Sequence, residues 1–142
     1  MNNDKSALEM FHLLSYYTLS HPDPIFFIHQ YAVDAFTAQY ADENTKPITI
    51  TFALIGLYLH LEKNFTGKEV QFAHMKLAKH RKNWPNFKLP VNRGDLSIFD
   101  VIKVPEGSNR DEAIILWCVS VWESYHDCHQ KVTDLVQKEL WN

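Results

Sequence analysis

The sequence predicts an all-α fold, a four- to five-helix bundle with a long crossover loop that contains a short helix. Apolar side chains recur at intervals of three and four residues over most of the chain, which is the period of an amphipathic helix. Residues typical of helix starts precede most of these segments, and only 4 glycines are available for tight turns. At 142 residues the chain is long enough to bury a core of its own, so we expect a single domain over residues 1–142.

The segment 23–40 is expected to be the central helix of the bundle. Pro24 suits the first helical position, and Asp23 before it can cap the free N–H groups. Two faces of this helix are apolar, and each carries one ionisable side chain, His29 on one face and Asp34 on the other. We therefore predict that both faces are buried.

Five further segments follow the helical period or carry helix-start signals. Thr66 and Glu69 match the T-x-x-E capping box, and Ser97 resembles the cap of a short helical piece. We predict helices over residues 5–19, 47–64, 66–82, 97–102 and 108–140, with residues 83–107 as the crossover connection. His21–Pro22 should end the first of these helices. Residues 96–104 are the one segment where a strand is an alternative.

The helix expected over residues 47–64 opens on Pro47 and has, beside its apolar stripe, a second stripe of small residues that ends in a histidine. The members of this second stripe are Thr49, Ala53, Gly56 and His60. Side chains this small let a neighbouring helix approach closely or leave a cavity. Close packing is the interpretation that we favour.

Composition and motifs exclude several classes of protein. The formal net charge of -3 excludes a generally basic nucleic-acid binder, and serine-hydrolase, P-loop, dinucleotide and zinc-ribbon patterns are absent. With no signal-peptide pattern and no apolar run that could span a bilayer, we expect a cytoplasmic protein without a membrane partner. Cys118 and Cys128 would lie about 15 Å apart along one helix, so both should be free thiols.

The stretch 76–93 is basic. Its cations, with no acid among them, are Lys76, Lys79, Arg81, Lys82, Lys88 and Arg93. Interleaved with Trp84 and Phe87, these cations could hold a strand of nucleic acid by charge and stacking. Such a run is more often a solvated helix end and loop, because cations suit a helix C-terminus. We favour the solvated interpretation and do not expect a nucleic-acid partner.

Four histidines lie on inward-facing stripes of four different expected helices: His29, His60, His74 and His129. Inward groups from facing helices build metal sites in bundles, and imidazoles hold zinc, nickel or iron while leaving positions for water or substrate. The alternative is a set of core histidines bonded to carbonyls, tyrosines or aspartates, since an unpaired one would cost about 1–3 kcal/mol. The structural alternative is favoured.

Asp34 has the same two interpretations. It falls about 140° round the helix from His29, so we do not expect the two side chains to bind one metal together. Its carboxylate would instead accept a hydrogen bond from a metal-binding imidazole and so orient it, or accept one from a buried donor of the core. We expect His29 and His129 to share one polar pocket, which His74 or His60 would complete if a divalent metal is bound.

Three segments resemble a family of bacterial proteins known only as a domain of unknown function. They are residues 29–39 (HQYAVDAFTAQ), 54–62 (LIGLYLHLE) and 117–125 (WCVSVWESY), and residues 96–101 are similar to the crossover segment of that family. The resemblance implies a small cytoplasmic protein of unassigned function, in which His29, Asp34 and His129 match the typical pattern of the family.

The chain departs from that pattern in two places. Tyr40 and Ala41 stand where the family has His-Pro, and Ala53 stands where a histidine is expected. If that histidine is a ligand in the family, His60, two turns along the same face, would have to replace it. The inward histidines also give a looser likeness to the DinB-like bundles, which hold a metal with three histidines; this likeness is an analogy of architecture.

The sequence therefore supports two functions of different classes. One is a cytoplasmic helical-bundle protein that holds a divalent metal on inward histidines for a small-molecule or hydrolytic reaction, with no catalytic residue assigned. The other is a non-catalytic interaction or structural protein with hydrogen-bonded core histidines. The partner would be an unknown small molecule or protein, a second copy of the chain included.

Overall fold

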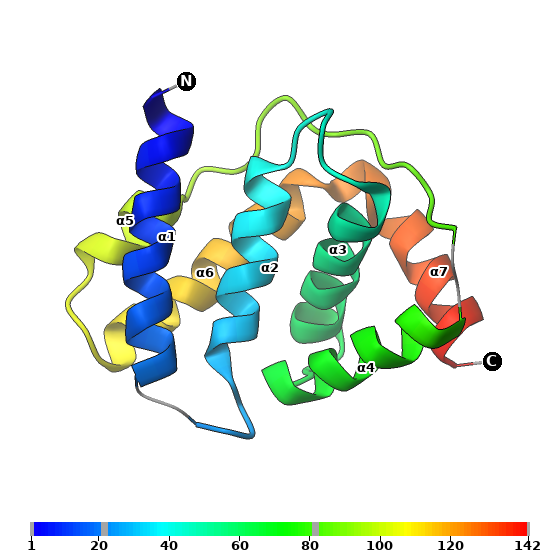
Figure 1. Cartoon of the computed structure of the whole chain (residues 1–142), viewed down its shortest axis with the longest axis horizontal. Helices are drawn as coiled ribbons and strands as arrows, with labels where there is room; N and C mark the ends of the chain where they lie inside the picture. Colours follow the sequence, from blue (N-terminus) through cyan, green and yellow to red (C-terminus); the bar gives the residue numbers. More distant parts are fainter. Residues whose placement is uncertain (1, 21–22, 81–82, 142) are drawn as a thin grey trace.

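The computed structural model describes residues 2–20, 23–80 and 83–141, which form helices joined by turns and loops, with no strand among them (Figure 1). In chain order the helices are α1 (Asn2–Ser20), α2 (Ile28–Tyr40), α3 (Pro47–Glu62), α4 (Gly67–His80), α5 (Ile98–Lys103), α6 (Ser108–Ser124), the 3-10 helix His126–Cys128 and α7 (His129–Leu140). The all-α prediction is confirmed. The finer expectation of a four- to five-helix bundle is not, because the described residues form seven α-helices.

Two helices form the middle of the molecule. α2 packs against α1, α3, α4 and α6, and α3 packs against α2, α4, α6 and α7 (Figure 1). The sequence of α3 is apolar on nearly every side, and its residues 50, 51 and 53–60 are all buried. A helix that is apolar all round belongs in a core, since each fully buried Leu or Ile contributes roughly 1.5–3 kcal/mol.

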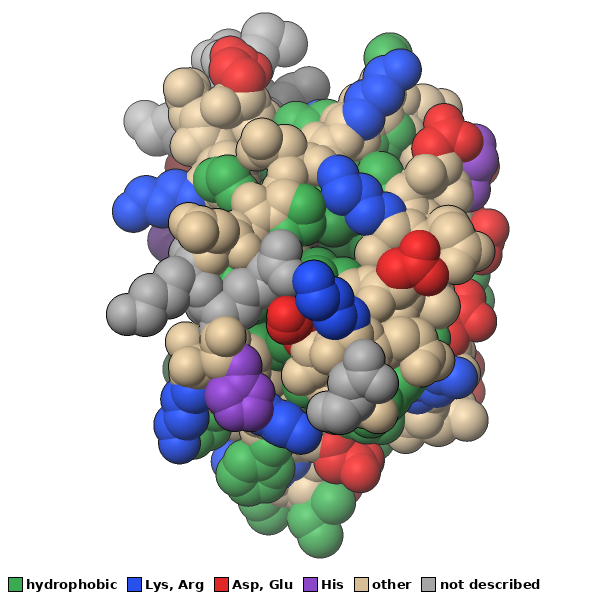
Figure 2. Space-filling model, turned by 90° about the vertical axis from the view of Figure 1, so that its right-hand side faces the viewer, with side chains coloured by type: hydrophobic (Ala, Val, Ile, Leu, Met, Phe, Trp, Pro, Cys, Tyr) green, Lys and Arg blue, Asp and Glu red, His purple; other side chains and the backbone are tan. Residues whose placement is uncertain are grey.

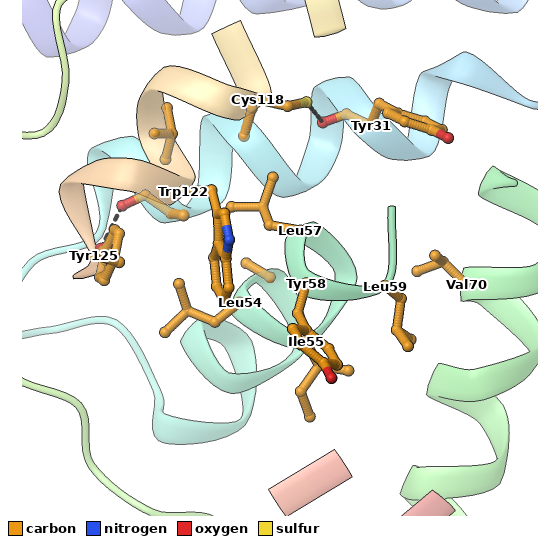
Figure 3. Close-up of a cluster of buried hydrophobic side chains, with 14 of the residues drawn as sticks. Tyr31, Leu54, Ile55, Leu57, Tyr58, Leu59, Val70, Cys118, Trp122 and Tyr125 are labelled. Carbon is orange, nitrogen blue, oxygen red and sulfur yellow. Dashed lines mark hydrogen bonds between the residues drawn. The ribbon is translucent and has the colours of Figure 1, made fainter. Parts of the chain in front are cut away.

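Figure 3 shows how α3 fills this core. Leu54, Leu57 and Leu59 of α3 lie among side chains from three other helices: Tyr31 of α2, Val70 of α4 and Trp122 of α6. The prediction that both faces of the second helix are buried holds for one face only. Asp34 and its neighbours on that face are buried, whereas the face with His29 is half-buried.

The start of α2 corrects the predicted helix over residues 23–40. The Asp23 side chain accepts hydrogen bonds from the backbone N–H groups of Ile25 and Phe26, both at 3.1 Å, but these bonds close a turn. Phe27 then takes a left-handed φ of 47°, and the helix begins only at Ile28. Gly67, at the start of α4, donates its N–H to the Phe26 carbonyl at 2.6 Å. Tertiary packing therefore decides where α2 begins.

The predicted starts at residues 47, 66, 97 and 108 are confirmed, whereas the first helix begins at Asn2, before the predicted residue 5. Thr66 and Glu69 exchange the two bonds of a capping box at 2.9 and 3.1 Å, and Ser97 and Asp100 form a second box at α5. Because α5 occupies residues 98–103, the strand alternative over residues 96–104 is wrong. The predicted stop at His21–Pro22 and the expected end of α4 at residue 82 lie outside the described residues.

The predicted single helix over residues 108–140 is wrong, because it breaks at Tyr125. α6 ends at Ser124, a 3-10 turn follows, and α7 starts at His129. Both cysteines are nevertheless free thiols, as predicted. Both are also buried, and Cys118 donates to the Tyr31 carbonyl at 3.3 Å. None of the described helices combines the length and the apolar character that crossing a bilayer requires.

Candidate functional site

The carboxylate of Asp34, which is 2% exposed, is a buried polar group of the core that is bonded through both of its oxygens. Its Oδ2 atom lies 2.9 Å from Nε2 of His60 on α3, and its Oδ1 atom accepts a 3.0 Å bond from the side-chain amide of Gln30. Gln30 precedes Asp34 by one helical turn, the spacing at which side chains meet on one helix face. Asp34 thus links α2 to α3.

The His60 ring is held on its other side as well. Its Nδ1 atom lies 3.4 Å from the Phe65 carbonyl, and the Tyr31 ring stacks on the imidazole at 3.7 Å between centroids. The Tyr31 hydroxyl donates to the same Phe65 carbonyl at 2.8 Å. Burial raises the pKa of Tyr31 to about 12, so this hydroxyl keeps its proton at neutral pH. Both ring nitrogens of His60 therefore face acceptors.

Gly56 makes the approach of Asp34 to α3 possible. A Cβ atom at this position would lie 2.0 Å from Oδ2 of Asp34 and 2.5 Å from its Cγ atom, far inside contact distance. The predicted close packing on the stripe of small residues is confirmed at this point. The side chain that fills the space is the Asp34 carboxylate.

The alternative use of the same stripe, a cavity, also occurs. A cavity of about 350 Å³ opens between α2, α3 and α4, and its lining includes Gln30, Asp34, Thr49, Ala53 and His74. One helix face therefore packs tightly at Gly56 and opens one turn earlier at Ala53, the position where a histidine was expected.

His74 lies in the wall of this cavity. Its ring stacks on Phe52 with centroids 4.7 Å apart, and its Nε2 atom donates to the Phe52 carbonyl at 2.8 Å. Burial lowers the pKa of His74, and this effect exceeds the opposing attraction of the Asp34 carboxylate. His74 is therefore neutral at pH 7, with its proton on Nε2 and a lone pair on Nδ1.

The other two predicted histidines have partners elsewhere. Nδ1 of His29 lies 2.9 Å from the Thr18 hydroxyl of α1, and burial lowers the pKa of His29. His129 stacks on Trp122 at 3.8 Å and donates from Nε2 to the Trp122 carbonyl at 2.8 Å. The partner of His29 lies on α1 and that of His129 on α6, and the common pocket of the two histidines stays a prediction.

The geometry does not support the predicted metal set. In the described part of the chain, no three or more His, Cys, Asp or Glu side chains are grouped so that they could hold a metal ion. What the structure brings together is Asp34 with His60, and His74 near them. Gln30 was not predicted as a partner of Asp34, although the two residues are one helical turn apart, and the Phe65 carbonyl was not predicted as a partner of His60 because no sequence signal marks it.

Cations of the basic stretch 76–93 have structural partners. Arg93 donates from Nη1 to the carbonyls of Gln39 and Ala41 at 3.0 and 2.8 Å, where α2 ends and its carbonyls lack helical partners. Lys76 donates to the Leu140 carbonyl at 3.2 Å. Figure 2, which views the end formed by α4 and α7, shows Lys and Arg side chains interspersed with Asp and Glu. Arg81 and Lys82 lie outside the described residues.

Comparison with known proteins gives a family without a function. The family model of DUF5946, described as a family of unknown function, matches residues 5–126. No curated protein and no solved structure matches the chain. The expected resemblance to a domain of unknown function is therefore confirmed, and the match spans all the segments quoted for it, whereas His129 lies beyond its end. The likeness to DinB-like bundles stays an analogy.

Proposed function

We propose that this chain, which belongs to the family of unknown function DUF5946, is a non-catalytic interaction protein whose inner histidines stabilise the fold. The observation that carries the proposal is the bonding of His60. A histidine acts as a general base or a metal ligand through a ring nitrogen that a substrate or metal can reach, but protein oxygens lie against both ring nitrogens of His60, the Asp34 carboxylate against Nε2 and the Phe65 carbonyl against Nδ1.

The other inner histidines support the same interpretation. Nε2 of His74 and Nε2 of His129 each donate to a backbone carbonyl at 2.8 Å, and each ring stacks on an aromatic neighbour. These are the bonds expected of core histidines whose polar atoms must be satisfied. An interaction role, in addition to a structural one, is supported by the exposed apolar side chains of α1, which include Leu13, Tyr16 and Leu19.

The test is metal content together with unfolding of untagged protein in the presence and absence of a chelator. We expect clearly less than one metal ion per chain and the same melting temperature with and without EDTA, because hydrogen bonds, not a metal, tie the histidines down. One zinc, nickel or iron ion per chain, with a melting temperature that falls in EDTA, would overturn the proposal.

A metal-supported small-molecule or hydrolytic role is the second candidate. The observation that favours it is that Asp34 and His74 line one cavity of about 350 Å³, and Nδ1 of His74 keeps a lone pair. These are two donors, fewer than the three protein ligands of catalytic zinc sites. Zinc titration by calorimetry tests this role. Saturable binding of one ion that is lost in His74→Ala and kept in His80→Ala would favour it, and no saturable binding would remove it.

A further inference from the structure

A second and larger cavity is lined by the loop before α5 and by α6. It is a groove of about 790 Å³ between the irregular segment 88–96 and the outer face of α6, which continues into the 3-10 helix His126–Cys128. It shares no lining residue with the cavity at Asp34, so its use does not depend on how the inner histidines are used. Its volume falls in the range of pockets that take small organic molecules.

The loop wall of the groove is anchored to the helices at its C-terminal end, residues 94–96. The Ser120 hydroxyl accepts bonds from the backbone N–H groups of Asp95 and Leu96 at 3.0 and 3.1 Å. Gly94, with a φ of 104°, lies so close that a Cβ would come within 2.6 Å of the Ser120 Oγ atom. Gln39 donates to the Leu96 carbonyl at 2.6 Å. The groove is therefore formed before any ligand arrives, which lowers the entropic cost of binding.

The floor of the groove is apolar and exposed to solvent. Leu116 and Val119 of α6 are 58% and 39% exposed, and Val91 of the loop is fully exposed. Three large apolar side chains that face water along one groove favour a ligand with an apolar body, because covering them removes apolar surface from water.

The charges around this floor are mostly of one sign. The lining carries three carboxylates, those of Asp95, Glu123 and Asp127, against one lysine, Lys88. His126 lies beside Asp127, with Nε2 3.1 Å from the carboxylate, and both side chains are exposed. A groove with an apolar floor and an excess of carboxylates complements a cation and repels an anion of the same shape.

We propose that this groove binds an amphipathic organic cation, with the apolar body of the ligand on Leu116 and Val119 and its positive group near Glu123 and Asp127. The apolar contact supplies most of the affinity. The exposed carboxylates supply the preference for positive charge, and that preference weakens as salt is added.

The experiment compares two dyes that share a xanthene core and differ in charge, rhodamine 6G as the cation and fluorescein as the anion, by fluorescence anisotropy. Wild-type protein should bind rhodamine 6G about three- to tenfold more tightly than fluorescein at low salt. The double variant Glu123→Gln with Asp127→Asn should lose this preference. Glu112→Gln should keep it, because Glu112 is an exposed carboxylate of α6 that does not line the groove.

A third variant tests the floor. The double variant Leu116→Ser with Val119→Ser should weaken the binding of both dyes by a similar factor, since it removes apolar contact and leaves the carboxylates in place. All variants should have melting temperatures close to that of the wild type, because the altered side chains are exposed. Equal binding of the two dyes, no binding of either, or a preference that survives removal of both carboxylates would each overturn the proposal.

Discussion

His60 and His129 have similar surroundings but different partners. Each ring stacks on an aromatic side chain, His60 on Tyr31 at 3.7 Å and His129 on Trp122 at 3.8 Å. His60 then bonds a carboxylate on another helix, whereas His129 bonds the carbonyl of the residue on which it stacks, close in sequence. The first histidine ties α2 to α3, and the second stabilises the local break between α6 and α7. Inward-facing position alone does not distinguish these two roles.

The largest effect is expected from His60→Ala. It leaves the buried Asp34 carboxylate with the Gln30 amide as its remaining side-chain donor, so we expect a loss of about 3–5 kcal/mol in the free energy of unfolding, measured by urea denaturation. The matched control is His126→Ala, an exposed histidine, which should change stability by less than about 0.5 kcal/mol. A loss below about 1 kcal/mol for His60→Ala would show that the pair is not central to stability.

The next effect tests the close approach at Gly56. Gly56→Ala places a methyl group against the Asp34 carboxylate and should cost about 1–3 kcal/mol by overpacking. If the clash is with that carboxylate, the cost should shrink when Gly56→Ala is made in an Asp34→Ala background. An unchanged cost in that background would mean that another neighbour of Gly56 is responsible.

Much of the fold was predictable where its causes are local. The capping boxes at Thr66 and Ser97 lie within four residues of chain, so their side chains suffice to mark a helix start. The break at Tyr125 escaped prediction because the inward-facing residues Trp122, Tyr125 and His129 continue across it at steps of three and four, with no Gly or Pro to mark it. At Asp23 the same side-chain bonds suit a helix cap and a turn, and the contact of Gly67 with Phe26 decides between them.

The candidate site was predictable only in part. The burial of Asp34 and the small-residue stripe with Gly56 and His60 both followed from helical spacing. The pairing of Asp34 with His60 did not, because the two residues lie on different helices and four inward histidines competed for one role. Their partners depend on how the helices pack, which no local pattern encodes.

The variant His129→Ala tests whether His129 contributes less to stability than His60. Loss of the bond to the Trp122 carbonyl and of the ring stack should cost about 1–2 kcal/mol, less than at His60, because no charge is left buried. His29→Ala, which loses the half-buried contact with Thr18, should cost about 0.5–1.5 kcal/mol. Urea denaturation measures both variants. A loss at His129 that equals the loss at His60 would remove the distinction.

The smallest effect is a pH dependence from His74. Burial lowers its pKa below the ordinary value of 6.5, so the unfolded chain binds the proton more readily than the folded chain. The contribution of His74 to stability is therefore complete above pH 6.5 and is lost as the pH falls from there toward the lowered pKa. Unfolding measured from pH 7 to pH 5 should show this loss, and His74→Gln should make it shallower. An identical pH profile for the variant would contradict the assignment.

The measurement that tests the central claim most directly is a double-mutant cycle between Asp34 and His60. If these side chains form the bonded pair that joins α2 to α3, Asp34→Ala and His60→Ala should each be costly, and the double variant should cost less than their sum by about 1.5–3 kcal/mol. Costs that add within about 0.5 kcal/mol would contradict the account, because they would show that the two side chains contribute to stability independently.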